Sequence, residues 1–552
     1  MDLSTGNNSD LCYITQISTE LVLQIIDHIP PASHFDFART CKRILACSSD
    51  VFKRHHDAFT KYHVSSDLEP ETVPTLLRSA FGYSDPIPAW YVRSFEIWYD
   101  RESWKYWKTI KFDTMPSDDN ENEPKSWKFL YGEWEDYLEP LEYGNGTSEH
   151  LETARVQMED GFDGILKAVL LANCPRLRNV KFVTPGVDRA LDDTSCLGWL
   201  ELFIQDAVRG ANPWPCGLAN LQSVAVGIPS ETWMSLPFQN QPQTYGPSNT
   251  SLLLQLLRLP NIESIYFKDY MRDPDNETDY SDLLPKRCSS VKHLFLDNCD
   301  ELGHSFREAL IEAPVGLLTA SFRAGNALLE HADSIVSGLR EQQQSLTSLM
   351  FYGYSEGGIH GYRCSAFRPE EIRSYHSLRY VSIDIQDVEL DAYYDEDSKE
   401  EEETNSDYIE RFFAECFPMN METLTLWGEL SSSYITWEPS QAAGLENAII
   451  KLIEEQGNLK AVFLEDVERV RGSARPHTDM LWFQKVIELG KEYDVDVHTL
   501  TNRNKMMHEI DFPEAPDQYD LVTGPWGKRP EDWVFSVYSG RRGPPGSPIA
   551  HD

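Results

Sequence analysis

A six-residue pattern of apolar side chains recurs along most of the chain and constrains its fold more than any other feature. The first, fourth and sixth positions of each hexad are apolar. Ten hexads follow one another: Val92/Phe95/Ile97, Leu177/Val180/Phe182, Leu221/Val224/Val226, Ile262/Ile265/Phe267, Val291/Leu294/Leu296, Leu317/Ala320/Phe322, Leu346/Leu349/Phe351, Leu378/Val381/Ile383, Met421/Leu424/Leu426 and Leu459/Val462/Leu464. The alternating second half of a hexad predicts a short strand. Ten in series predict stacked structural units.

Segments with apolar residues at helical spacing lie between the hexads. They are Leu252 to Arg258, His304 to Glu312, Ala327 to Arg340, Tyr408 to Cys416 and Leu445 to Glu455. Alternating strands and helices predict an α/β fold. A doubly wound sheet would also alternate them, but its strands would be more continuously apolar, so a repeat array is favoured. We expect such an array to expose a concave parallel sheet suited to proteins or peptides, with helices on the convex side.

The hexads resemble those of leucine-rich repeats. Val291-x-x-Leu294-x-Leu296-x-x-Cys299 also carries the Cys that this family places after the strand. From Leu177 to Leu459 the intervals run from 26 to 44 residues, which is longer than the family's usual spacing of about 20 to 29. The resemblance implies a leucine-rich-repeat-like α/β solenoid over residues 63–505.

Residues 14–62 predict a short module of three amphipathic helices. The first begins after Ser18 as N-cap and ends at Pro30-Pro31. Its apolar residues are Ile17, Leu21, Val22, Ile25, Ile26 and Ile29. The second is expected from Ser33, with Asp36 completing a capping box and Phe37, Ala38, Cys41 and Leu45 toward the core. The third is expected from Asp50, with Val51, His55, Phe59 and Tyr62 on one face. So small a module predicts apolar surface reserved for a partner or the next domain.

This module resembles an F-box. Residues 17–30, Ile-Ser-Thr-Glu-Leu-Val-Leu-Gln-Ile-Ile-Asp-His-Ile-Pro, are similar to the family's opening Leu-Pro-x-Glu-Leu-Leu-x-x-Ile-Leu-x-x-Leu-Pro, with Ser18 in place of the Pro. Residues 38–43, Ala-Arg-Thr-Cys-Lys-Arg, resemble its second signature, in which a Cys precedes basic residues. The resemblance implies docking on the Skp-type adaptor of a cullin ubiquitin ligase. The residues that it places toward the adaptor are Ile17, Leu21, Ile25, Ile29 and Pro30.

The composition excludes several classes of partner. The formal charge of −40 disfavours nucleic acid and an anionic membrane surface. No secretion signal and no run of about 18 apolar residues is apparent, so a cytoplasmic or nuclear protein is expected. The ten cysteines form no CxxC pair and predict reduced thiols.

Four segments fall outside the repeat pattern. Residues 1–13 are expected to be a disordered N-terminus, and residues 391–407 a disordered acidic loop. Residues 100–160 form a Trp-rich acidic insertion, which could bind a partner but more often packs onto its own domain. Residues 506–552 are rich in Pro and Gly and are expected to cap the array and end in a loose tail.

The sequence favours a binding protein over an enzyme. Gly353-Tyr354-Ser355-Glu356-Gly357 matches a nucleophile elbow, and Asp384 and His498 follow in triad order, but a loop rather than a helix is expected after it. The adjacent His55 and His56 would point about 100° apart on a helix and cannot share one metal ion. No cofactor motif is present. The sequence therefore predicts a non-catalytic substrate-recognition subunit of a Skp-cullin-F-box ubiquitin ligase, with an unknown protein substrate held by the solenoid. The alternatives are a non-ligase scaffold and a serine hydrolase that uses Ser355.

Overall fold

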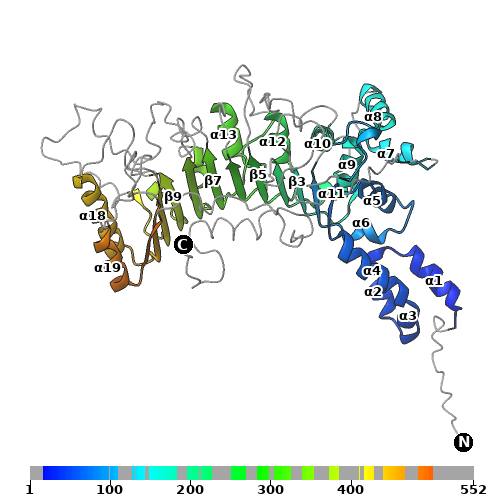
Figure 1. Ribbon diagram of the computed structural model, residues 1–552, viewed down its shortest axis with the longest axis horizontal. Helices are drawn as coiled ribbons and strands as arrows, with labels where there is room; N and C mark the ends of the chain where they lie inside the picture. Colours follow the sequence, from blue (N-terminus) through cyan, green and yellow to red (C-terminus); the bar gives the residue numbers. More distant parts are fainter. Residues whose placement is uncertain are drawn as a thin grey trace, which may run out of the picture.

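The chain forms a parallel sheet of twelve strands in which spatial order equals chain order (Figure 1). The computed structural model describes residues 16–98, 100–109, 127, 129–130, 132–142, 148–182, 195–210, 213–226, 250–268, 283–297, 304–324, 338–353, 372–384, 410, 416–427, 439–465 and 483–500. The strand order never reverses, whereas a doubly wound sheet contains a reversal. The α/β class is therefore confirmed, and the doubly wound alternative is excluded.

The strands are β1 (Val64–Ser66), β2 (Ser94–Ile97), β3 (Asn179–Phe182), β4 (Ser223–Val226), β5 (Ser264–Lys268), β6 (His293–Asp297), β7 (Thr319–Ala324), β8 (Ser348–Gly353), β9 (Tyr380–Asp384), β10 (Thr423–Trp427), β11 (Ala461–Glu465) and β12 (Asp496–Leu500). Helices α1 (Thr19–His28), α2 (His34–Ala38), α3 (Lys42–Cys47) and α4 (Ser49–Tyr62) precede the sheet. The others are α5 (Thr72–Ala80), α6 (Ile87–Tyr91), α7 (Glu133–Glu142), α8 (Ser148–Asp160), α9 (Gly164–Asn173), α10 (Cys196–Val208), α11 (Cys216–Ala219), α12 (Thr250–Leu256), α13 (His304–Glu312), α18 (Pro439–Glu455) and α19 (Gln484–Tyr493).

All ten hexads form the predicted strands, β2 to β11. Every hexad side chain is at most 5% exposed and belongs to one continuous core. The register explains this, because equivalent positions pair across the sheet, as Val224 does with Val180 and Ile265. A strand alternates its side chains between two faces, so this register sends all the hexad residues to the same face. The sheet ends with β12, which follows the strand of the last hexad.

One backbone carbonyl joins each strand to the next at the edge of the sheet where the strands begin, which we call the start edge. The carbonyl of Arg178 accepts hydrogen bonds from the N–H groups of Gln222 (2.8 Å) and Ser223 (2.9 Å). The same forked contact recurs from the carbonyl of His63 to that of Glu422. The carbonyls that accept are those of His63, Arg93, Arg178, Gln222, Glu263, Lys292, Leu318, Thr347, Arg379 and Glu422. We call this series of forked hydrogen bonds the staircase. It fixes the register of neighbouring strands whatever the length of the chain between them.

Polar side chains directly before the hexads reinforce the start edge. Asn261 donates to the carbonyl of Ala219 at 2.7 Å, and Asn420 donates to that of His376 at 2.8 Å. Asn220, Ser290, Ser377 and Asn458 donate to a carbonyl of the preceding repeat in the same way. An Asn or Ser before the first apolar residue is therefore part of the repeat, a signal that the hexad pattern alone omits.

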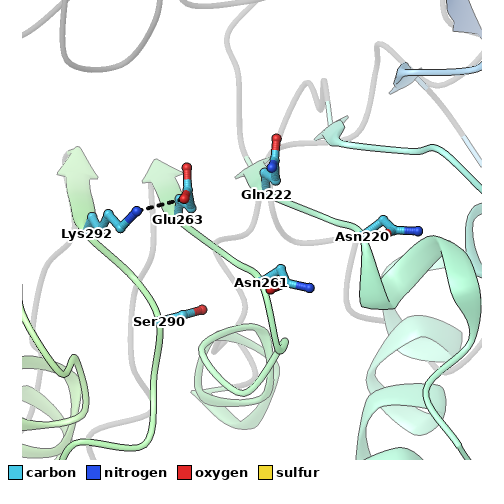
Figure 2. Close-up of a pocket in the computed structure, with 6 residues that line it drawn as sticks. All are labelled: Asn220, Gln222, Asn261, Glu263, Ser290 and Lys292. Carbon is cyan, nitrogen blue, oxygen red and sulfur yellow. Dashed lines mark hydrogen bonds and ion pairs between the residues drawn. The ribbon is translucent and has the colours of Figure 1, made fainter.

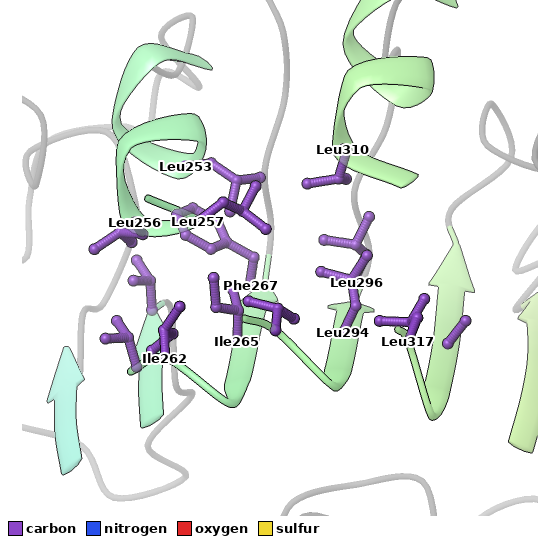
Figure 3. Close-up of a cluster of buried hydrophobic side chains, with 14 of the residues drawn as sticks. Leu253, Leu256, Leu257, Ile262, Ile265, Phe267, Leu294, Leu296, Leu310 and Leu317 are labelled. Atoms are coloured by element: carbon purple, nitrogen blue, oxygen red, sulfur yellow. The ribbon is translucent and has the colours of Figure 1, made fainter. Parts of the chain in front are cut away.

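The helices pack on the face of the sheet that carries the hexads. Figure 3 shows Leu253 of α12 and Leu257, just after that helix, above Ile265 of β5, with Leu310 of α13 above Leu296 of β6. Helices expected at His304 to Glu312 and Leu445 to Glu455 are confirmed by α13 and α18, and Leu252 to Arg258 overlaps α12. Of the segment Ala327 to Arg340 the structure describes only the end, where a 3₁₀ turn, Leu339–Gln342, begins. Most of Tyr408 to Cys416 lies outside the described residues.

The N-terminal helical module, which we define as α1 to α4, contains four α-helices and not the predicted three. Ser18 caps α1 as predicted, since its hydroxyl accepts a hydrogen bond from the Leu21 N–H at 3.3 Å. The second predicted helix is wrong: α2 ends at Ala38 and α3 begins at Lys42, with an extended backbone at Cys41. No side-chain cap bond forms at Ser33, so the expected capping box is absent. The extended backbone at Cys41 separates α2 from α3.

Tryptophans of the 100–160 insertion pack onto the domain itself. Trp107 is 2% exposed and donates its Nε1–H to the carbonyl of Gly161 at 2.7 Å. Trp104 donates to the carbonyl of Glu159 at 2.7 Å. Both bonds join the start of the insertion to its end, at α8. Trp107 also belongs to the continuous core and Trp104 packs against it, so the packing role is confirmed for these two side chains. The segments 1–13, 391–407 and 506–552 lie outside the described residues.

Gly217 allows α11 to approach α9 closely. A Cβ atom at this position would overlap the carbonyl oxygen of Leu171 and lie 2.9 Å from that of Ala172. We therefore expect Gly217→Ala to lower the free energy of unfolding by about 1 to 3 kcal/mol, because backbone atoms cannot yield cheaply. Urea denaturation measures this. Gly457→Ala is the matched control, since no atom lies within 4 Å of its Cβ position. Equal effects of the two substitutions would contradict the close packing.

Candidate protein-binding surfaces

Helix α1 divides its apolar residues between a core and an exposed face. Val22 and Ile26 are buried, at 0% and 2% exposure, and pack with Ile44, Val51 and other residues of the module. Leu21 and Ile25, each one position earlier, are 49% and 37% exposed. They are four residues apart and therefore share one side of the helix. The single stripe expected from the sequence is thus two adjacent faces, of which one is free to contact a partner.

The other predicted adaptor-facing residues lie at the ends of α1. Pro30 is exposed, and Ile17 and Ile29 are half-buried. Ile17 packs against the core of the module, so it supports α1 as well as flanking its exposed face. The structure therefore places Leu21 and Ile25 at the centre of the predicted set.

The module exposes further apolar side chains, among them Leu45, which was expected to face its core. Leu45 of α3 and Phe59 of α4 are 49% and 47% exposed. Phe35 of α2 is 46% exposed and stacks on Phe52, with ring centroids 5.1 Å apart. The break between α2 and α3 explains why Leu45 is exposed, because a continuous helix would have turned this side chain inward. Such a density of exposed apolar side chains in one small module is typical of an interaction surface.

A chain of two buried histidines and a tyrosine connects α2, α4 and α6. His34 Nε2 donates to the carbonyl of Ile26 (2.9 Å), so His34 Nδ1 accepts from His55 Nε2 (2.8 Å). His55 Nδ1 in turn accepts from the Tyr91 hydroxyl at 3.0 Å. Both nitrogens of the His55 ring thus have a hydrogen-bond partner. Burial, followed by the neighbouring His34, lowers the pKa of His55 to about 4.

This pKa shift predicts acid sensitivity. Above about pH 6.5 the imidazole of His55 is neutral in both the folded and the unfolded chain. Between pH 6.5 and about 4 the unfolded chain gains this proton and the folded chain does not, so the free energy of unfolding falls as the pH falls. We expect His55→Gln to reduce this slope in denaturation measured at pH 7, 6 and 5, while exposed His56→Gln leaves it intact. An unchanged slope in His55→Gln would contradict the assignment.

A buried ionic cluster joins the insertion to the first repeats. Lys167 Nζ of α9 lies 2.8 Å from an Asp67 oxygen, 3.0 Å from Asp163 and 3.2 Å from Asp100. Arg101, 1% exposed, pairs with Asp163 at 3.0 Å. Burial alone would lower the pKa of Lys167, but the three carboxylates together raise it. Lys167, Asp67 and Asp163 are each at most 1% exposed, so the centre of the cluster is closed to solvent and we assign it a structural role.

Removing the lysine should therefore destabilise the chain. Lys167→Met leaves buried carboxylates without their counterion, which costs about 3 to 5 kcal/mol in the free energy of unfolding. Lys292→Met is the matched control, because Lys292 and Glu263, 2.8 Å apart, are each 46% exposed. A surface pair contributes about 0 to 1 kcal/mol. Chemical denaturation of both variants measures the difference, and comparable losses would argue against a buried cluster.

The second face of the sheet carries buried aromatic and apolar side chains as well. Tyr266, Phe295, Met350 and Phe463 alternate with hexad residues and so point away from the helices. Each is only 1% exposed, and none belongs to the core beneath the helices. The expectation of an open sheet surface is therefore wrong at these four positions.

A shallow polar pocket opens at the start edge of β4 to β6 (Figure 2). Asn220, Asn261 and Ser290 line it together with Gln222, Glu263 and Lys292. The first three side chains already donate to backbone carbonyls, and Lys292 pairs with Glu263. The pocket is thus built from structural contacts of the repeats, and its remaining polar groups suit a contact with a protein surface.

The residues considered for catalysis are not brought into one described site. Ser355 lies outside the described residues. Asp384 ends β9 and His498 lies on β12, with β10 and β11 between them. Among the described residues no group of three His, Cys, Asp or Glu side chains could hold a metal ion, and no described helix is long and apolar enough to cross a bilayer.

Comparison with models of known protein families finds no match. No curated protein matches the chain either. Its function is therefore argued from its own residues.

Proposed function

We propose that the chain is a substrate-recognition subunit of a Skp-cullin-F-box ubiquitin ligase. The N-terminal helical module would bind the Skp-type adaptor, and the repeat sheet, as a leucine-rich-repeat-like solenoid, would hold a protein substrate. The observation that carries the proposal is the pair of exposed apolar side chains on α1, Leu21 and Ile25, at positions where the F-box motif places adaptor contacts.

The packing of α1 supports this assignment. Leu21 and Ile25 are exposed while Val22 and Ile26 hold the helix to the module. Exposing two large apolar residues on one small helix is unfavourable in water and becomes favourable when a partner buries them, at about 25 cal/mol per Å² of apolar surface. Leu45 and Phe59 extend the exposed apolar surface to α3 and α4. A module that merely capped the sheet would have these side chains turned toward it.

The position of the module suits a recruiting subunit. Figure 1 shows α1 to α4 at one end of the sheet, with the remaining strands extending away from them. The module shares its core with Ile87 of α6, which ties it to the sheet. A substrate bound at the start edge of the sheet would thus be held at a fixed distance from the adaptor. The chain itself supplies no chemistry in this scheme and accelerates transfer by raising the effective concentration of a substrate lysine.

Adaptor binding tests the proposal. Leu21→Asp and Ile25→Asp should each weaken binding of a purified Skp-type adaptor by about 30-fold or more, the cost of a central interface residue. Biolayer interferometry with the full chain measures this. Folding should be unaffected, because both side chains are exposed.

Leu23→Asp is the matched control. Leu23 is 41% exposed but lies two residues from Leu21 and Ile25, which places it about 200° around the helix. We expect this variant to bind as the unchanged chain does. If the unchanged chain shows no binding at micromolar adaptor, or if all three variants bind equally well, the ligase proposal fails and a scaffold without an adaptor becomes the better account.

A further inference from the structure

Three arginines gather where the N-terminal helical module meets the sheet. Arg93 directly precedes β2, and Arg178 directly precedes β3. The pairing of Ser94 with Asn179 makes the two arginines neighbours, and the Arg178 N–H donates to the Arg93 carbonyl at 2.8 Å. Arg176 stands over the ring of Trp90 in α6, 4.6 Å from the ring centre. Arg178 is exposed, and Arg93 and Arg176 are half-buried.

No described carboxylate forms an ion pair with any of the three. The Arg93 guanidinium donates to the carbonyls of Trp90 (2.9 Å) and Val92 (3.2 Å), which orient it without neutralising it. Burial, followed by the like charges of Arg176 and Arg178, lowers the pKa of Arg93 to about 10. Burial and Arg178 lower the pKa of Arg176 as well. The positive charges are therefore close enough to repel one another.

The same start-edge position is neutralised in later repeats. Lys292 pairs with Glu263 at 2.8 Å, and Lys460 pairs with Glu422 at 2.7 Å. Arg379 also pairs with Glu422. Arg93 and Arg178 occupy the equivalent positions in the first repeats, where a neighbouring carboxylate would have relieved the repulsion. In a chain of net charge −40, three neighbouring arginines with no ion-pair partner among the described carboxylates are a local exception.

We propose that Arg93, Arg176 and Arg178 bind an oxyanion carried by a peptide of the recruited protein. Guanidinium groups form forked hydrogen bonds with phosphate and carboxylate oxygens, and a bound anion would remove the mutual repulsion of the arginines. Trp90 and Tyr91 flank the cluster and offer aromatic surface to the peptide around the anion. Only the peptide origin of the anion rests on the proposed function.

A single compact anion fits this cluster better than an extended polyanion. The cluster spans only the starts of two adjacent strands, about 5 Å apart. Beyond it, the acidic surface would repel a nucleic acid or an anionic bilayer. The two remaining sources of the oxyanion are a phosphorylated side chain and the carboxylates of an acidic segment.

Isothermal titration of the full chain with small probes tests the site. The probes are N-acetyl-phosphoserine amide and N-acetyl-glutamate amide, each titrated into the unchanged chain, Arg176→Gln, Arg178→Gln and, as a control with the same charge change, exposed Arg373→Gln. We expect binding of at least one probe to weaken tenfold or more in Arg176→Gln and Arg178→Gln and to stay unchanged in Arg373→Gln. Tighter binding of the phosphoserine probe indicates a phosphorylated partner, and comparable or tighter binding of the glutamate probe an acidic one.

The proposal is overturned if neither probe binds the unchanged chain, or if binding is equal in all variants. Thermal unfolding with each probe gives a second readout, because a ligand that binds the site should raise the unfolding midpoint of the unchanged chain more than that of Arg178→Gln. Adaptor binding through Leu21 and Ile25 is independent of these residues, so the two proposals can fail separately.

The pH dependence of probe binding distinguishes titration of the phosphate from titration of groups in the protein. A phosphate monoester gains its second charge near pH 6, whereas sulfate keeps its charge from pH 5 to 8. If phosphoserine is the favoured probe, its binding should strengthen from pH 5 to 7 while that of inorganic sulfate stays constant. Sulfate also controls for His63, whose pKa is lowered by burial and by Arg93, and for Tyr91, whose pKa burial raises. A parallel rise for both ions would place the titration in the protein and contradict the phosphate assignment.

Discussion

A single backbone carbonyl at the start of each strand holds the structure in register. The carbonyl of Arg178 accepts from Gln222 and Ser223, that of Gln222 accepts from the next strand, and the contact continues along the sheet. A slip of one residue at any step would turn the hexad side chains of that strand to the opposite face. Because all hexads must face the helices to be buried, the staircase and the apolar core enforce each other. The loops between strands can therefore vary in length without disturbing either.

This arrangement leaves the start edge as the place where sequence can vary for function. The side chains of Asn261 and Asn420 donate hydrogen bonds to the preceding repeat. The second position of each hexad contributes its backbone to the staircase, so its side chain can differ from repeat to repeat. In the middle and late repeats it carries ion pairs such as Lys292 with Glu263. In the first two hexads it carries Arg93 and Arg178, beside the module that we propose binds the adaptor. A binding site at this end would lie near the adaptor that we propose the module binds.

Much of the fold could be predicted from the sequence, because repetition averages out the ambiguity of short strands. Ten hexads gave ten strands, whereas β1 was missed because Val64-Ser65-Ser66 carries only one apolar residue. The break between α2 and α3 was missed because an apolar spacing cannot reveal an extended residue such as Cys41. The sequence predicted an apolar face on α1 but not which of its residues are buried. Packing against Ile44 and Val51 buries Val22 and leaves Leu21 exposed. Asp67 and Asp100 are far from Lys167 in sequence, so the sequence gives no sign that they meet it, and only Asp163, four residues away, is a local partner.

Hydrogen–deuterium exchange of the full chain, with and without a purified Skp-type adaptor, tests the central claim most directly. If the N-terminal helical module binds the adaptor through the exposed face of α1, amides of residues 19–62 should exchange more slowly in the complex. Exchange in strands β4 to β12 should remain unchanged, because the staircase is already formed. Unchanged exchange throughout residues 19–62, or protection confined to the sheet, would contradict the account.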